Sequence, residues 1–229
     1  MSTAITGVSS MATRAILGDL SRRYQEASGV EVAIKAMGGV DAAKLVRAGE
    51  VTDVVVLASG VMAQLEAEGH VLAGSIQGFT RSGMAIVVPA GAPHPDISNE
   101  EAVRRAVGAA RKVGYSTGPS GDHLLQLGAK WGLLPAEAER FVKAPPGVPV
   151  GSLVAQADAD LGFQQLSEFL GVEGIEIVGP LPPEIQAVTV FAAGVCSASP
   201  GPDRARDLIA YLASPETAAV KRQHGMEPA

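Results

Sequence analysis

The stretch GGVDAAKLVRAGEVTDVVVLA, residues 38–58, decides between the fold classes. It opens on a Gly-Gly turn, continues with helical periodicity over residues 41–48 and stops at Gly49, a residue typical of helix ends. The run DVVVLAS that follows, residues 53–59, is almost wholly apolar, as expected of a central parallel strand with both faces covered. A helix followed by such a strand is the repeating unit of an α/β fold.

The same alternation extends along the chain in both directions. A helix is predicted over about residues 12–27, where Ile16, Leu20 and Tyr24 share one face. Another is predicted over 99–111, with Ser98 or Asn99 as its cap. Further strands are predicted at residues 3–8, 30–37, 83–91, 112–117, 159–165, 175–182 and 187–195. The loop at 89–98 holds three prolines, which favours a boundary there.

Composition excludes several classes of function. Among 229 residues, 47% are hydrophobic and 18% charged, which is typical of a globular protein. Aromatic residues make up only 4%, and the net charge is −6, so we expect no nucleic-acid partner. A small anionic ligand must therefore be held by local dipoles and a few cations.

The sequence predicts neither a metal site nor a cofactor. Its one cysteine, Cys196, lies in an apolar run, and its four histidines are scattered without metal-ligand spacing. The sequence predicts neither a transmembrane run nor a signal peptide. The expected location is cytoplasmic for the chain as written, and periplasmic if a leader has been removed.

A second stretch, YSTGPSGDH over residues 115–123, places hydroxyls and glycines where a strand gives way to a helix. A helix N-terminus carries unpaired N–H groups and the positive end of the helix dipole, so these residues can form a socket for an anion. The alternative is a helix simply capped by Ser or Asp. The stretch alone does not decide between them.

Taken together, several segments resemble the type II periplasmic solute-binding proteins, in the molybdate-binding-protein-like branch that also includes aconitate isomerase. The resemblance covers nearly the whole chain in the family's order, and its more specific pieces are RAGEVTDVVVLA and YLASPETAAVKRQHG. The other matching segments are VSSM (8–11), SGMAIVVPAG (82–91), GYSTGPSG (114–121) and ADADLGFQQ (157–165).

The resemblance implies two α/β lobes, each a mixed, mostly parallel sheet flanked by helices, with a ligand cleft between them. Residues 1–82 and 190–229 would form lobe one, and 83–189 lobe two. The chain would cross between the lobes near Ser82–Met84 and again near Ala187–Phe191.

Ligand contacts in this family come from turns between strands and helices. The first turn here is expected to be Ser9-Ser10-Met11. Arg14 lies one helical turn further on, where its guanidinium suits a carboxylate. The full set of expected ligand-binding residues is Ser9, Ser10, Arg14, Gly39, Ser82, Ser120, Gly121, Val150, Gln164 and Gln165.

Two of these positions depart from the molybdate binders. Gly39 stands where a serine is usual, and Gln165 stands where a tyrosine is usual. Glycine enlarges the pocket and glutamine both donates and accepts hydrogen bonds, which favours a larger organic anion.

Two functions remain open at this point. The first is binding of a small anion, expected to be an organic di- or tricarboxylate, with the membrane component of an ABC transporter as a partner. The second is cofactor-independent isomerisation of a small unsaturated carboxylate by proton transfer, for which His123 is the first candidate base. Binding requires no acid–base pair, whereas isomerisation does.

Overall fold

The computed structural model describes residues 4–145 and 147–229, and the chain divides into two compact units. Unit 1 extends to Arg81 and resumes from Thr189 to Ala229, and unit 2 is Ser82–Val188. The chain passes from one unit to the other within strands β4 (Gln77–Pro89) and β9 (Val188–Val195). The proline-containing loop at 89–98, where composition favours a boundary, lies inside unit 2.

The sheet of unit 1 has the order β2 (Val32–Met37), β1 (Ile5–Ser10), β3 (Val54–Ala58) and β9. β1 pairs in parallel with β2 and β3, and β9 runs antiparallel to β3. A short strand, β10 (Glu227–Pro228), pairs with the first part of β4.

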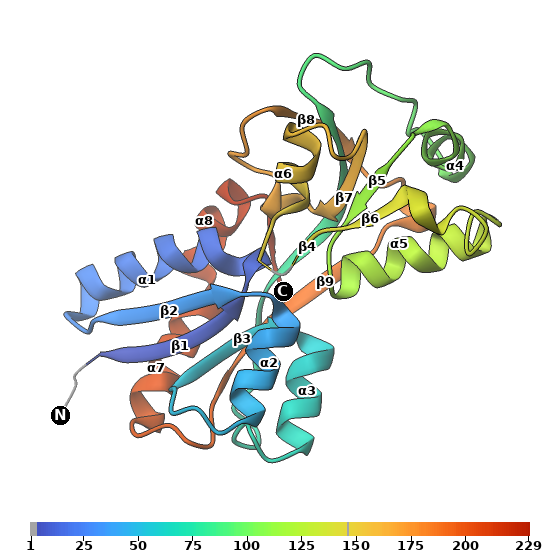
Figure 1. Ribbon diagram of the computed structural model, residues 1–229. Helices are drawn as coiled ribbons and strands as arrows, with labels where there is room; N and C mark the ends of the chain where they lie inside the picture. Colours follow the sequence, from blue (N-terminus) through green and yellow to red (C-terminus); the bar gives the residue numbers. More distant parts are fainter. Residues whose placement is uncertain (1–3, 146) are drawn as a thin grey trace. The chain divides into compact units, whose positions relative to one another are not determined.

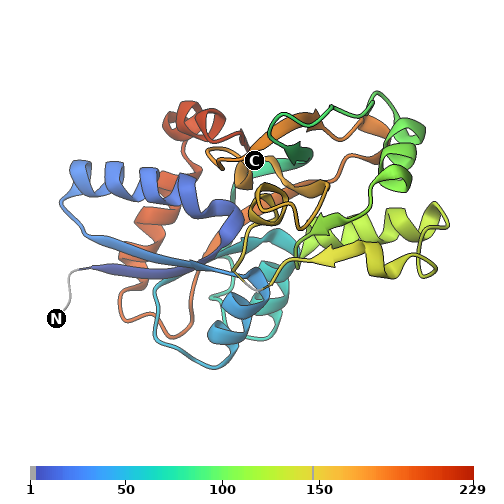
Figure 2. The same ribbon diagram turned by 45° about the horizontal axis from the view of Figure 1, so that its top comes forward.

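Helices cover both faces of this sheet, which explains the apolar run of β3. Val54 and Val56 pack with α1 and α7, whereas Val55 and Leu57 pack with α2 and α3. Figures 1 and 2 show α1 and α2 on opposite sides of β1 and β2. The helices of unit 1 are α1 (Arg14–Ser28), α2 (Gly39–Arg47), α3 (Ser59–Ala67), α7 (Pro202–Ala213) and α8 (Ala218–Gln223).

One expectation about β1 is wrong. Ser9 and Ser10 are not in a turn, because pairing with Ala36 and Met37 of β2 extends the strand to Ser10. The turn is instead a 3-10 segment, η1 (Met11–Thr13). Thr3, where the strand was expected to begin, lies outside the described residues.

Unit 2 has its own mixed sheet. β4 pairs antiparallel with β7 (Leu161–Gln165) and β8 (Ile175–Pro180), and β5 (Val113–Tyr115) lies between β7 and β6 (Phe141–Lys143) with parallel pairing. The sequence analysis missed β6. Mixed sheets flanked by helices confirm the predicted α/β class.

Helices also cover both faces of the second sheet. α4 (Glu100–Ala109) and α5 (Pro119–Lys130) pack on one face, and α6 (Val150–Ala155) packs on the other. Asn99 caps α4 by accepting a hydrogen bond from the Ala102 N–H at 2.9 Å, as the sequence predicts.

A buried cation lies in unit 1. Lys221 is 1% exposed, its ammonium is 5.9 Å from the centre of the Phe79 ring, and it forms no ion pair with another described residue. Burial lowers the pKa of Lys221 because it disfavours the charged form. A cation–π contact offsets only part of this cost.

Lys221→Met should therefore raise the free energy of unfolding at neutral pH by about 1 kcal/mol, because the thioether fills similar space without a charge. Since the folded-state pKa of Lys221 is lowered, wild-type stability rises as pH approaches the ordinary lysine pKa, and the difference should narrow there. Urea denaturation of both proteins at neutral and at alkaline pH measures this. A less stable variant at neutral pH would contradict the prediction.

Candidate ligand-binding site

In unit 1, two predicted site residues lie side by side at the carboxyl ends of the parallel strands. Ser10 ends β1 and is 9% exposed, and Gly39 begins α2 just after β2. A Cβ atom on Gly39 would lie 3.8 Å from the Ser10 Cβ and 3.9 Å from Leu57 Cδ2. A Cβ atom at position 39 would therefore be in ordinary van der Waals contact with both residues, and glycine leaves that volume free beside Ser10. In α/β sheets, ligands bind at this edge.

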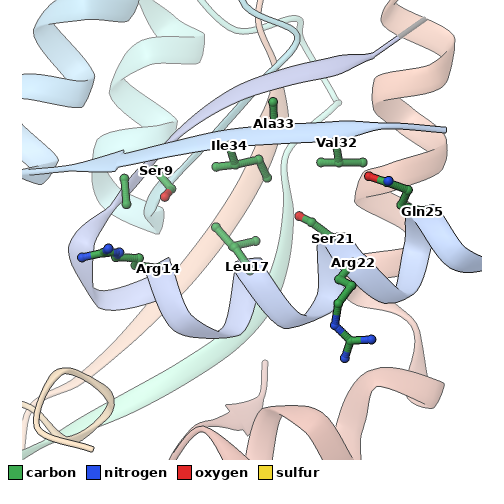
Figure 3. A pocket seen from close by; sticks show the side chains of 11 residues that line it. Ser9, Arg14, Leu17, Ser21, Arg22, Gln25, Val32, Ala33 and Ile34 are labelled. Carbon is green, nitrogen blue, oxygen red and sulfur yellow. The ribbon is translucent and has the colours of Figure 1, made fainter. Parts of the chain in front are cut away.

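Ser9 and Arg14 lie elsewhere in unit 1. Neighbouring residues of a strand point to opposite faces, so Ser9 faces α1 while Ser10 faces away from it. Ser9 and Arg14 line a pocket between α1 and β2 (Figure 3). The structure thus separates the four predicted residues of unit 1 into two pairs.

In unit 2, the turn before α5 is built on glycines rather than on a side-chain cap. The cap residue is Gly118, with a φ of 95°, and no side chain caps the helix. The alternative of a helix capped by Ser or Asp is therefore wrong, because the left-handed backbone at this position favours glycine. Ser120 is 4% exposed, and its hydroxyl lies 3.2 Å from that of Ser116.

The same turn requires glycine at position 121. A Cβ atom at this position would lie 1.8 Å from the Ser116 carbonyl oxygen, so no other residue fits without a shift of the backbone. This close approach holds Ser120 in the first turn of α5, where helices expose backbone N–H groups.

The two glutamines of β7 are both buried, each 3% exposed, although one inward-facing amide was expected. The side chain of Gln164 has protein partners at both ends: its Oε1 accepts from the Val150 N–H at 2.9 Å, and its Nε2 donates to Glu168 Oε1 at 2.7 Å. Gln165 pairs with Met84 in the sheet. Gln164 therefore links the start of α6 to the acidic residue that follows β7.

Glu168 is a functional candidate that the sequence analysis missed. It ends the 3-10 segment η3 (Leu166–Glu168), which directly follows β7. Burial raises the pKa of Glu168 to about 8, and the hydrogen bond from Gln164 opposes that rise. The signal in the sequence is an acidic residue enclosed by the apolar Leu166, Phe169 and Leu170.

His123 and Ser82 have backbone partners in unit 2. His123 Nε2 donates to the Ile185 carbonyl oxygen at 2.7 Å. Ser82 is 2% exposed, and its hydroxyl donates to the Gly83 carbonyl oxygen at 3.4 Å.

Within residues 4–145 and 147–229, no group of three or more His, Cys, Asp or Glu residues could hold a metal ion. In the same residues, no helix has the length and apolar character needed to span a bilayer.

Comparisons with known proteins agree on the kind of protein this chain is similar to. Residues 5–227 match the family described as bacterial extracellular solute-binding protein. An aconitate isomerase of a Pseudomonas species is 35% identical over 99% of this chain and 88% of that protein.

Two solved structures share the fold. The periplasmic molybdate-binding protein of Azotobacter vinelandii matches with a TM-score of 0.80 at 19% identity, over 97% of this chain and 98% of the other. The substrate-binding domain of a putative molybdenum ABC transporter from Clostridium difficile matches with a TM-score of 0.74 at 14% identity, over 99% of each chain. The predicted type II periplasmic fold is therefore confirmed.

Proposed function

The chain belongs to the family of bacterial extracellular solute-binding proteins, and we propose that it binds a small organic di- or tricarboxylate. The observation that carries this proposal is the 35% identity to a protein named for its action on aconitate, a tricarboxylate. With a net charge of −6, the chain must hold such an anion by local donors rather than by its overall charge.

In unit 1, we assign the Ser10 hydroxyl and the open space beside Gly39 to this ligand. The hydroxyl donates to a carboxylate oxygen. The absent side chain at position 39 leaves room for a molecule larger than a tetrahedral oxyanion, since a Cβ there would meet no atom closer than 3.8 Å.

In unit 2, we assign the Ser120 hydroxyl and the first turn of α5 to the binding of a carboxylate group. Backbone N–H groups and the helix dipole at a helix start favour a negative charge. Gln165 contributes an amide in place of a hydroxyl. Val150 and Gln164 are not assigned to the ligand. The Val150 N–H donates to Gln164 Oε1, so these two residues position the site.

Isomerisation of a bound unsaturated carboxylate is a second candidate function, favoured by the name of the same relative. Moving a double bond requires that one carbon loses a proton and another gains one, with no net oxidation. Glu168, with a pKa of about 8, has the proton affinity that such a transfer requires near neutral pH. His123, through Nδ1, is the alternative carrier.

A chain that only binds its ligand needs a partner that receives it. The membrane component of an ABC transporter is the partner we propose for that case, on the analogy of the structurally similar transporter domain. Such a role would place the protein in the periplasm.

The test combines binding with turnover. Thermal shifts with trans-aconitate, cis-aconitate, citrate, succinate and molybdate should show stabilisation by the carboxylates. Proton NMR of trans-aconitate with the protein in D₂O then separates the two functions, because isomerisation produces the cis isomer and binding alone does not. Tight molybdate binding with no response to any carboxylate would refute the proposal.

Ser120→Ala should weaken binding of the best carboxylate about tenfold while leaving the melting temperature of the ligand-free protein nearly unchanged. The reason is that Ser120 does not cap α5, so the fold loses little when its hydroxyl is removed. Ser98→Ala, at an exposed serine before α4, is the matched control. Unchanged affinity in Ser120→Ala would remove this residue from the site.

A further inference from the structure

Unit 1 contains a pocket that the proposed carboxylate site does not use. It lies between α1 and β2 and has a volume of about 460 Å³, within the range of roughly 300–1,000 Å³ typical of small-molecule sites. Its walls are formed in part by Leu17 and Ile34, whose side chains point toward each other in Figure 3. The middle of the pocket is therefore apolar.

Two buried hydroxyls line this pocket without a partner in the described structure. Ser9 is 0% exposed and Ser21 is 8% exposed, and neither Oγ forms a hydrogen bond. Figure 3 shows the Ser21 hydroxyl directed from α1 toward β2, and the Ser9 hydroxyl directed from β1 toward α1. A buried hydroxyl without a partner is costly, so two of them on one pocket indicate an occupant with polar groups.

Two arginines line the pocket, and within the described part of the chain only one of them is paired with acidic residues. The guanidinium of Arg14, at the start of α1, forms no ion pair or hydrogen bond with another described residue. Arg22 also lines the pocket, but its guanidinium binds Asp19 and Glu26 at 2.8 Å and 2.7 Å and points away from β2 (Figure 3). Ser9 and Arg14, whose guanidinium is unpaired among the described residues, thus both line the pocket near the start of α1.

Spacing along the helix defines the length of the occupant. Arg14 and Ser21 are seven residues apart, which corresponds to about 10 Å at about 1.5 Å per residue. The groups that bind polar atoms therefore lie at two places, with the apolar side chains of Leu17 and Ile34 lining the pocket between them. Gln25, one turn beyond Ser21, places its amide at the same far end (Figure 3).

We propose that the pocket between α1 and β2 binds a short aliphatic carboxylate that carries a hydroxyl at its far end. The carboxylate accepts from Arg14 and Ser9, the aliphatic chain packs between Leu17 and Ile34, and the far hydroxyl pairs with Ser21. Ser9 and Ser10 point to opposite faces of β1, so this pocket is separate from the space beside Ser10 and Gly39.

Three probes of matched length test the proposal on the full chain: 6-hydroxyhexanoate, hexanoate and 1,6-hexanediol. Titrations followed by ¹⁵N-correlated NMR should shift the amides of α1 and β2 most with 6-hydroxyhexanoate. Hexanoate lacks the hydroxyl and the diol lacks the carboxylate, so each should bind at least about fivefold more weakly. Absence of shifts in α1 and β2 with all three probes would overturn the proposal.

Variants assign the two ends. Ser21→Ala should abolish the preference for 6-hydroxyhexanoate over hexanoate, and Arg14→Met should weaken both acids about tenfold. Arg22→Met is the matched control and should change neither affinity. Ser120→Ala should also leave them unchanged, which separates this pocket from the proposed carboxylate site. Equal losses in Arg14→Met and Arg22→Met would overturn the assignment, as would a loss in Ser120→Ala.

Discussion

Gly121→Ala should destabilise the protein by more than about 4 kcal/mol, a loss reached only when a substitution forces a backbone shift or breaks a core. The added methyl carbon would lie 1.8 Å from the Ser116 carbonyl oxygen and 3.2 Å from Tyr115 Cδ2. Neither the end of β5 nor the start of α5 can move freely, because the Tyr115 strand pairs on both edges and Leu124 is buried in the core. The expected result is a partly unfolded unit 2.

Denaturation followed by the fluorescence of the single tryptophan measures this effect, since Trp131 lies directly after α5. Gly108→Ala is the matched control: it lies within α4, no atom is within 4 Å of its added Cβ, and it should gain about 0.5–1 kcal/mol. A loss below about 1 kcal/mol in Gly121→Ala would show that the turn relaxes to accept a side chain.

The layers of the fold can be predicted from the sequence because a strand that is buried on both faces has an uninterrupted run of apolar residues. The run Val54–Leu57 has no polar residue, since Val54 and Val56 face one layer of helices while Val55 and Leu57 face the other. Strands β5 and β6 have three residues each, too few to establish a period. β5 could be predicted from the Gly-rich helix start that follows it, a signal that β6 lacks.

The sequence predicts which turns could bind a ligand, but not the contacts that the residues of these turns make. A Gly-rich turn before α5 is visible in the sequence, whereas the hydrogen bond between Gln164 and Val150 joins residues 14 positions apart and has no local signal. Ser9 and Ser10 look equivalent in the sequence. The pairing of β1 with β2 directs them to opposite faces, and that register becomes known only from the sheet.

The pKa of Glu168 also depends on packing that the sequence does not contain. Burial raises that pKa to about 8, well above the value of 4.5 expected in the unfolded chain. Between these two values the folded protein holds one proton more than the unfolded chain. The stability associated with Glu168 is therefore fully present below the unfolded-state pKa and is lost as pH rises toward the folded-state pKa.

Glu168→Gln should remove this pH dependence, because glutamine resembles the protonated acid and its Oε1 still accepts from Gln164. Relative to the variant, the wild-type protein should lose about 1.4 kcal/mol of unfolding free energy for each pH unit in the middle of this range, and roughly 3.5 kcal/mol in all between about pH 5 and about pH 8. Denaturant unfolding of both proteins across this range measures the difference between their unfolding free energies. The titration of every other group cancels in this difference. Glu173→Gln, at an exposed glutamate, is the control and should run parallel to the wild type. Parallel curves for wild type and Glu168→Gln would mean that Glu168 titrates as an ordinary carboxylate, and its assignment as a proton carrier would then be wrong.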